Sequence, residues 1–154
     1  MTSRVRRAEL ADAEELARLR WQWRVEERGE TGLAWEDFRT RFAQWWLARA
    51  DRHLAFLAEV DGVAAGTMWL AIIDRVPGPG RWERRAGLVQ NAYVVPELRD
   101  KGVGTALLTA LLAEAAQLGL DYLGVHPSER SYGFYRRGGF TDSSKVLELR
   151  PVGD

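Results

Sequence analysis

The sequence predicts an α/β fold of the mixed α+β kind, with a central sheet of about six to seven strands flanked by about four helices. Three observations lead to this prediction. Two apolar strand patterns joined by Asp61-Gly62 indicate an antiparallel hairpin. From residue 86 onward, strand and helix patterns alternate, which favours a parallel pair of strands. A length of 154 residues fits one domain, residues 1–154, with its own core.

The first part of the chain is expected to hold one strand and two helices. Residues 5–10 are a short strand candidate, and a helix begins near Ala11 with acidic residues in its first turn, where the helix dipole favours them. Glycines at 29 and 32 end that helix. A second helix is expected over residues 34–49, because aromatic residues recur there at helical spacing. These aromatic residues are Trp35, Phe38, Phe42 and Trp45.

The middle of the chain reads as three strands. Residues 53–60 and 63–73 flank the hairpin turn, and Gly66 permits a bulge or a close approach of another backbone. A loop with two prolines and two glycines follows, and Trp82 at its end is expected to anchor it. The third strand covers residues 86–95 and ends at Pro96.

The last part predicts helix, strand, helix and strand. Apolar residues at helical spacing follow residue 103, and Gly119 ends that helix. Residues 120–125 form the next strand, expected to lie parallel to residues 88–95. Ser128 is a plausible N-cap of a short helix that ends at Gly138-Gly139. A final strand is expected over residues 140–149.

Composition excludes several classes of function. Lys and Arg number 22 and Asp and Glu number 22, so no basic surface for nucleic acid is expected. The chain has no cysteine, and its two histidines, His53 and His126, are far apart, so no metal site is predicted. No apolar run has the length of a signal peptide core or a membrane span, so a cytoplasmic location is expected.

A strand–turn–helix unit over residues 90–112 carries the strongest chemical signal. A strand ending at Pro96 is followed by a short turn with Arg99 and Lys101, and a helix opens at Gly102 and Gly104. The first N–H groups of a helix have no partner within the helix, and the dipole adds positive charge there. Such a turn is an anion cradle suited to phosphate, and glycine lets the phosphate approach the backbone.

Two motifs together resemble the GNAT superfamily of N-acetyltransferases. The spacing Arg99-x-x-Gly102-x-Gly104 after a strand is similar to the acyl-CoA-binding signature of that family. Residues 134–140, Phe-Tyr-Arg-Arg-Gly-Gly-Phe, are similar to a second family segment, at the expected distance from the first. The resemblance covers residues 5–149. It implies the GNAT fold, in which the strand ending at Val95 splays away from its parallel neighbour.

The resemblance implies transfer of an acetyl group from acetyl-CoA to a primary amine of a small molecule or peptide. A backbone N–H near Val95 would stabilise the developing oxyanion, and Tyr135 would act as the general acid toward the departing thiolate. The residues that the resemblance assigns to acyl-CoA binding are Val94, Val95, Arg99, Asp100, Lys101, Gly102, Val103, Gly104, Thr105, Ser128, Ser131, Phe134 and Tyr135.

The resemblance does not assign the general base, the group that removes a proton from the amine. Some family members use a glutamate at the position occupied here by Leu88. Candidates for the base are Glu83, Glu26, Glu27 and His126. Residues that are candidates for binding the acceptor are Asn91, Tyr93, His126 and Trp23.

Two alternatives stay open at this point. The aromatic stripe of residues 35–45 is core packing, part of the wall of the acceptor pocket, or the contact of a homodimer. Because the glutamate base is absent while the cofactor signature is intact, the chain is either an N-acetyltransferase or a GNAT-fold acyl-CoA-binding module with impaired catalysis.

Overall fold

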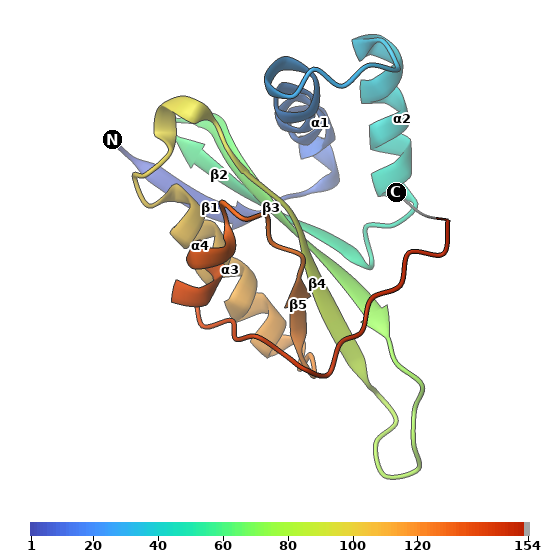
Figure 1. The fold of residues 1–154 in the computed structure, drawn as a ribbon. Helices are drawn as coiled ribbons and strands as arrows, with labels where there is room; N and C mark the ends of the chain where they lie inside the picture. The colour runs from blue at the N-terminus through green and yellow to red at the C-terminus, as the bar shows by residue number, and fades with distance from the viewer. Residues whose placement is uncertain (153–154) are drawn as a thin grey trace.

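The computed structural model describes residues 1–152, which build a five-stranded mixed sheet with helices on both faces (Figure 1). The strands are β1 (Ser3–Arg7), β2 (His53–Val60), β3 (Val63–Asp74), β4 (Arg85–Val94) and β5 (Leu123–Val125). The helices are α1 (Ala13–Trp21), α2 (Trp35–Leu47), α3 (Val103–Gln117) and α4 (Tyr132–Arg137). Shorter helical segments are η1 (Leu10–Asp12), the π-helical η2 (Gln22–Glu27) and η3 (Pro96–Leu98).

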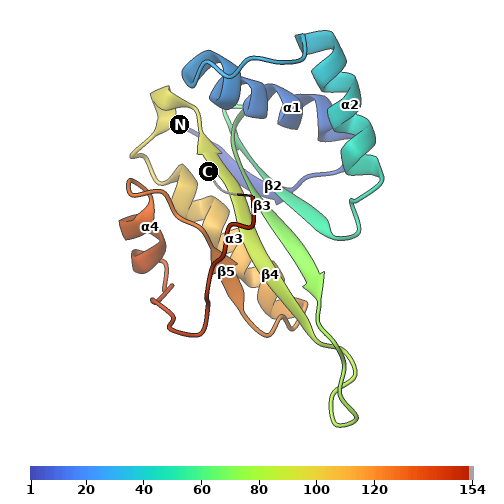
Figure 2. The same cartoon turned by 45° about the vertical axis from the view of Figure 1, so that its right-hand side comes forward.

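The strand order is β1-β2-β3-β4-β5, antiparallel except for the parallel pair β4–β5. Helices α1 and α2 cover one face, and α3 and α4 lie on the other (Figures 1 and 2). Each face has its own core: Leu107 and Leu111 of α3 are fully buried on one side, and Leu16 of α1 with Trp69 of β3 packs on the other. The predicted α+β class is therefore confirmed.

The parallel pair is confirmed, and it diverges. Pairing between β4 and β5 ends at Val89 and Val125, whereas β4 continues through Gln90 to Val94. On its other edge β4 stays paired with β3, but a β-bulge interrupts the register. The one residue of β3 between Thr67 and Trp69 lies opposite two residues of β4. Asn91 lies in this bulge with φ +53°, a left-handed conformation that non-glycine residues seldom adopt.

Gly66 marks a close approach of backbones, as expected. A Cβ at this position would lie 2.9 Å from the carbonyl oxygen of Tyr93, so a larger residue would push β3 and β4 apart. The glycine thus holds β3 against the end of β4 at which the strands diverge.

Two expectations about the sheet are wrong. The strand expected over residues 140–149 is absent, and Leu147 is 96% exposed. Apolar β-favouring residues make a strand only where another strand pairs with them, and the three-residue β5 pairs with β4 alone. The described residues therefore hold five strands instead of six or seven. The first strand also differs: it covers Ser3–Arg7, and Leu10 already belongs to η1.

The loop between β3 and β4 projects from the body of the protein (Figure 1). Trp82 was expected to anchor it, but its side chain is 77% exposed and contacts no core. The loop is held at its base instead, where Arg75, Arg81 and Arg84 surround the carboxylate of Asp121.

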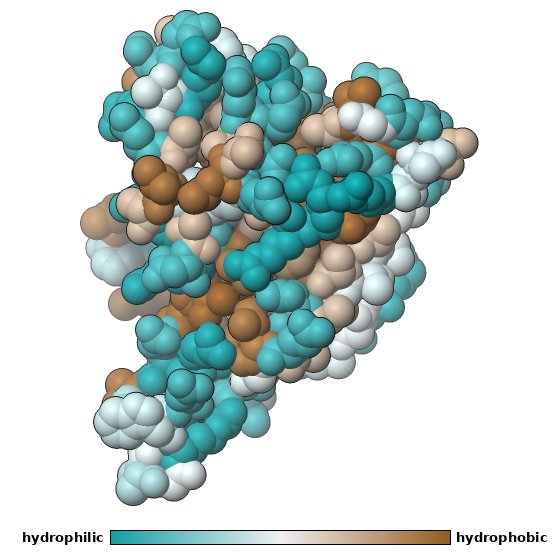
Figure 3. Space-filling model, turned by 180° about the vertical axis from the view of Figure 1, so that it is seen from behind, coloured by the Kyte–Doolittle hydropathy of each residue, from teal (hydrophilic) through white to brown (hydrophobic). Residues whose placement is uncertain are grey.

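On the face seen from behind, hydrophobic residues form separate patches among hydrophilic ones (Figure 3).

Candidate active site

The N-terminus of α3 is open to a ligand. Gly102 adopts φ +84°, and the first intrahelical hydrogen bond runs from the Ala106 N–H to the Gly102 carbonyl at 3.0 Å. The N–H groups of Val103, Gly104 and Thr105 precede that bond, and no side chain caps the helix. Unpartnered N–H groups at a helix start bind anions, so this turn fits the pyrophosphate of a coenzyme.

The two sequence motifs meet at this turn. A Cβ on Gly104 would lie 3.6 Å from the Phe134 ring of α4, and one on Gly138 would lie 2.5 Å from Leu108 of α3. Gly138 therefore allows α4 to pack closely on α3, while Gly104 leaves room beside Phe134. The second motif thus positions one wall of the cradle.

Arg99 does not point its charge into the cradle. Its Nε donates to the Val94 carbonyl at 2.9 Å, and its Nη2 donates to both carboxylate oxygens of Glu27 at 3.1 Å. The guanidinium also lies 5.5 Å from the centre of the Tyr93 ring. Arg99 therefore ties the turn to β4 and η2, whereas Lys101 of the same turn is exposed.

The predicted oxyanion donor needs a correction of one residue. The Val95 N–H donates to the Ala65 carbonyl at 2.9 Å and is thus held in the β3–β4 pairing. N–H groups alternate in direction along a strand, so the Val94 N–H points to the opposite edge. At that edge β5 no longer pairs with β4, and Val94 therefore presents its N–H to the gap between the strands.

Tyr135 lies on α4, in the core between the sheet and α3. Its side chain is 5% exposed and packs against Phe134 and Phe140, with ring centres 5.1 and 5.5 Å away. The hydroxyl has no hydrogen-bond partner within residues 1–152. Burial raises the pKa of this phenol, which keeps it protonated.

Ser128 and Ser131 hydrogen-bond each other just before α4. The Ser131 N–H donates to the Ser128 hydroxyl at 3.2 Å, and the Ser128 N–H donates to the Ser131 hydroxyl at 3.0 Å. The expectation that Ser128 is the N-cap is wrong: the N-cap is Ser131, and the two serines form a turn that precedes the helix.

Polar and aromatic side chains gather on the other side of β4, against α1 and η2. Tyr93 donates its hydroxyl to Glu27 at 2.8 Å, and its ring stacks on Trp23 at 6.1 Å. Asn91 accepts a hydrogen bond from Arg20 at 3.0 Å. The sequence-predicted acceptor residues Asn91, Tyr93 and Trp23 are therefore brought together by the fold.

A comparison with protein families settles the assignment. The model described as the acetyltransferase (GNAT) family matches residues 13–140 of this chain. The chain belongs to the GNAT family. The mycothiol acetyltransferase of Propionibacterium freudenreichii subsp. shermanii is 30% identical to this GNAT chain over 120 residues, which are 76% of this chain and 36% of that protein.

A further relative is also named an N-acetyltransferase. An uncharacterized N-acetyltransferase of Methanocaldococcus jannaschii is 26% identical over 117 residues, 69% of this chain and 48% of that protein. This GNAT chain therefore spans about half, or less, of the length of these two relatives.

Solved structures share the fold over their whole length. A GCN5-related N-acetyltransferase from Ralstonia eutropha JMP134 is 26% identical with a TM-score of 0.72, covering 97% of this chain and 99% of that one. A predicted acetyltransferase from Clostridium acetobutylicum, solved with acetyl-CoA, has 23% identity and a TM-score of 0.79, covering 98% and 97%.

The GNAT fold separates the four candidate bases. Glu83 precedes β4 whereas the cradle follows it, so about 30 Å of strand lies between them. Glu26 lies in a depression with Arg18, Trp21 and Trp35. Both oxygens of Glu27 are engaged, and His126 is exposed just after β5, where the two strands diverge.

Sequence reasoning missed the hydrogen bond from Arg20 to Asn91. Residues 20, 23 and 27 have the spacing of one helix face, which was the available signal. The π-helical turn of η2 shifts that face locally, and such turns are frequent at functional sites.

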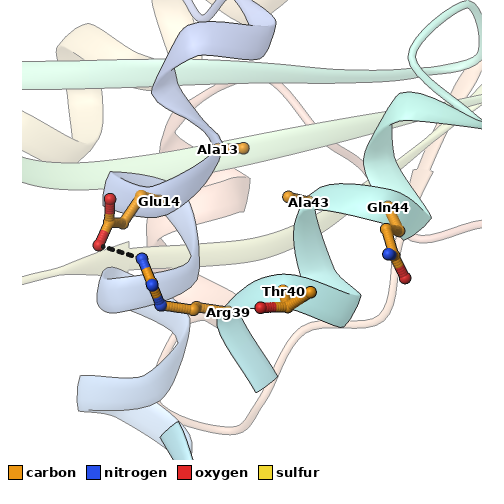
Figure 4. Close-up of a pocket in the computed structure, with 6 residues that line it drawn as sticks. All are labelled: Ala13, Glu14, Arg39, Thr40, Ala43 and Gln44. Atoms are coloured by element: carbon orange, nitrogen blue, oxygen red, sulfur yellow. Dashed lines mark hydrogen bonds and ion pairs between the residues drawn. The ribbon is translucent and has the colours of Figure 1, made fainter. Parts of the chain in front are cut away.

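A surface depression lies elsewhere, between α1 and α2 (Figure 4). Glu14 and Arg39 form an ion pair across it at 3.0 Å. Its lining is Ala13, Glu14, Arg39, Thr40, Ala43 and Gln44. Since its charged side chains already satisfy each other, it offers no reactive group to a substrate.

Within residues 1–152, no helix is both long and apolar enough to cross a membrane.

Proposed function

We propose that this protein is an N-acetyltransferase that moves an acetyl group from acetyl-CoA to a primary amine of a small molecule or peptide. The observation that carries the proposal is the uncapped N-terminus of α3, which follows the end of β4 that no longer pairs with β5. A diphosphate held by that turn would place the arm of the coenzyme in the gap between the strands.

Acetyl-CoA supplies the acetyl group as a thioester: a C–N bond forms, the C–S bond breaks, the amine loses a proton and the thiolate gains one. The N–H groups of Val103, Gly104 and Thr105 bind phosphate oxygens. The Val94 N–H hydrogen-bonds the carbonyl oxygen as it gains negative charge, a type of contact that contributes about 3 kcal/mol in other enzymes.

Tyr135 and His126 complete the proposed roles. The phenol of Tyr135 stays protonated at neutral pH and donates a proton or a hydrogen bond to the leaving sulfur. His126 is the one of the four candidate bases that is both unengaged and next to the diverging strands, so it accepts the proton of the amine.

The second candidate function is that of a GNAT-fold acyl-CoA-binding module with impaired catalysis. Leu88 supports it, since the glutamate that some family members use at this position is absent. One experiment separates the two. The protein is incubated with acetyl-CoA and a panel of amines, and free thiol and acetylated product are both measured. Amine-dependent release of both supports the enzyme. Tight binding of CoA without turnover on any amine supports the module.

A further inference from the structure

Arg20 is a partly buried cation that no carboxylate of residues 1–152 contacts directly, although Glu30 attracts it through space. It lies in the last turn of α1, and one of its five N–H donors is used, by Asn91 Oδ1 at 3.0 Å. No carboxylate in residues 1–152 forms an ion pair with it. Burial, followed by the nearby charge of Arg24, lowers its pKa. A guanidinium in such a place is strongly stabilised by an incoming anion.

The charges around Arg20 leave an excess of positive charge. Three guanidinium groups surround the Trp23 ring, those of Arg20, Arg24 and Arg28, at 5.2, 5.7 and 5.9 Å from its centre. Glu30 pairs with Arg24 through two hydrogen bonds of 2.9 and 3.2 Å. Glu30 attracts Arg20 and Arg28 only through space, so one carboxylate faces three guanidinium groups around this indole.

This excess lies next to the proposed reaction centre. Asn91 accepts the hydrogen bond of Arg20 through its carbonyl oxygen, so its NH₂ group stays available as a donor. Asn91 occupies the bulge of β4, two residues after the last pair with β5 and three before Val94. Arg20 and Asn91 thus offer several N–H donors within a few residues of the proposed oxyanion donor.

We propose that the acceptor amine carries a carboxylate, as an amino acid does, and that Arg20 together with Asn91 binds this carboxylate. The proposal rests on the N-acetyltransferase function proposed above and names its substrate class. The planar fork of arginine matches the two oxygens of a carboxylate. Trp23, stacked on Tyr93, gives the remainder of the acceptor an aromatic surface.

The test uses pairs of amines that differ only in the carboxylate: phenylalanine with 2-phenylethylamine, leucine with 3-methylbutylamine, and lysine with 1,5-diaminopentane. We expect kcat/KM to be at least 10-fold higher for the carboxylate-bearing member of a pair. Arg20→Gln should remove this preference, and Arg20→Lys should retain part of it. Equal or better turnover of the decarboxylated member in every pair overturns the proposal.

Arg18→Gln is the matched control. Arg18 lies on the same helix and packs on another indole, 5.3 Å from the centre of Trp35, away from Asn91. We expect its substitution to leave the preference for the carboxylate unchanged. Loss of the preference in both variants would show a general effect of helix charge, and it would contradict a specific site at Arg20. Far-ultraviolet circular dichroism confirms that each variant is folded.

A binding measurement separates this proposal from the proposed reaction. The protein loaded with CoA is titrated by calorimetry with N-acetylphenylalanine and with N-acetyl-2-phenylethylamine. Tighter binding of the first compound, lost in Arg20→Gln, supports the carboxylate site even if no amine is acetylated. Equal binding of the two compounds, or a difference that survives Arg20→Gln, refutes the site even if amines are acetylated.

Discussion

Glu27 accepts hydrogen bonds from Arg99 through both of its carboxylate oxygens, at 3.1 Å each. The two residues come from opposite halves of the chain: Glu27 ends the π-helical segment on the acceptor side, and Arg99 begins the turn that forms the phosphate cradle. Tyr93 donates to the same carboxylate. The proposed acceptor side and coenzyme side are therefore linked by one ion pair.

Breaking this link should loosen the cradle. In Glu27→Gln the charge of Arg99 loses its partner, and we expect a loss of about 1–2 kcal/mol in the free energy of unfolding, because both side chains are partly buried. The dissociation constant for CoA should rise severalfold. Urea denaturation and calorimetric titration with CoA measure the two effects.

Glu30→Gln controls for Glu27→Gln. Glu30 also accepts two hydrogen bonds from an arginine, Arg24, in the same part of the chain, but it does not contact the cradle. CoA affinity should stay unchanged in this variant. If both variants weaken CoA binding equally, the contact between Glu27 and Arg99 has no special role in holding the turn.

The position of the cradle follows from short-range sequence signals, which is why it was predictable. A strand ending at proline, a turn with Gly102 and a helix are encoded within about twenty residues. The contact between Glu27 and Arg99 joins residues far apart in the sequence, and no local pattern encodes it. The direction of the Val95 N–H was also not predictable, since the bulge of β4 depends on how β3 pairs with it.

The absent last strand has a similar cause. The segment around Val146 and Leu149 has the composition of a strand, but pairing depends on a neighbour that composition does not reveal. By contrast, residues 53–60 were predicted with the bounds that β2 has, because the hairpin signal at Asp61-Gly62 fixes both the partner and the turn.

Gly104→Trp should abolish CoA binding. The indole would fill the space over the first turn of α3 and keep phosphate away from its N–H groups, and we expect at least a 100-fold loss of affinity by calorimetry. Thr109→Trp adds the same bulk to an exposed site one turn further along α3 and should bind CoA normally. Unchanged affinity in folded Gly104→Trp would refute the phosphate assignment.

Tyr135→Phe should lower kcat by about 100-fold or more and change the KM for acetyl-CoA little, since general acid catalysis typically contributes about 100- to 10,000-fold. Burial raises the pKa of the phenol, so the acid form persists from neutral pH up to at least its ordinary value near 10. The wild-type kcat should therefore show no decline due to this group between pH 7 and 9. A kcat in Tyr135→Phe equal to that of the wild type would remove Tyr135 from the chemistry.

His126→Gln should lower kcat/KM at pH 7 by about 10-fold or more if His126 accepts the proton of the amine. The defect should shrink at pH 9, because a larger share of the amine is then already neutral and needs no base. His53→Gln provides the control: His53 lies in β2, with its ring 5.0 Å from that of Trp45, and its loss should change thermal stability but not the pH dependence. A defect of the same size at both pH values would exclude His126 as the base and favour a structural role for it at the end of β5.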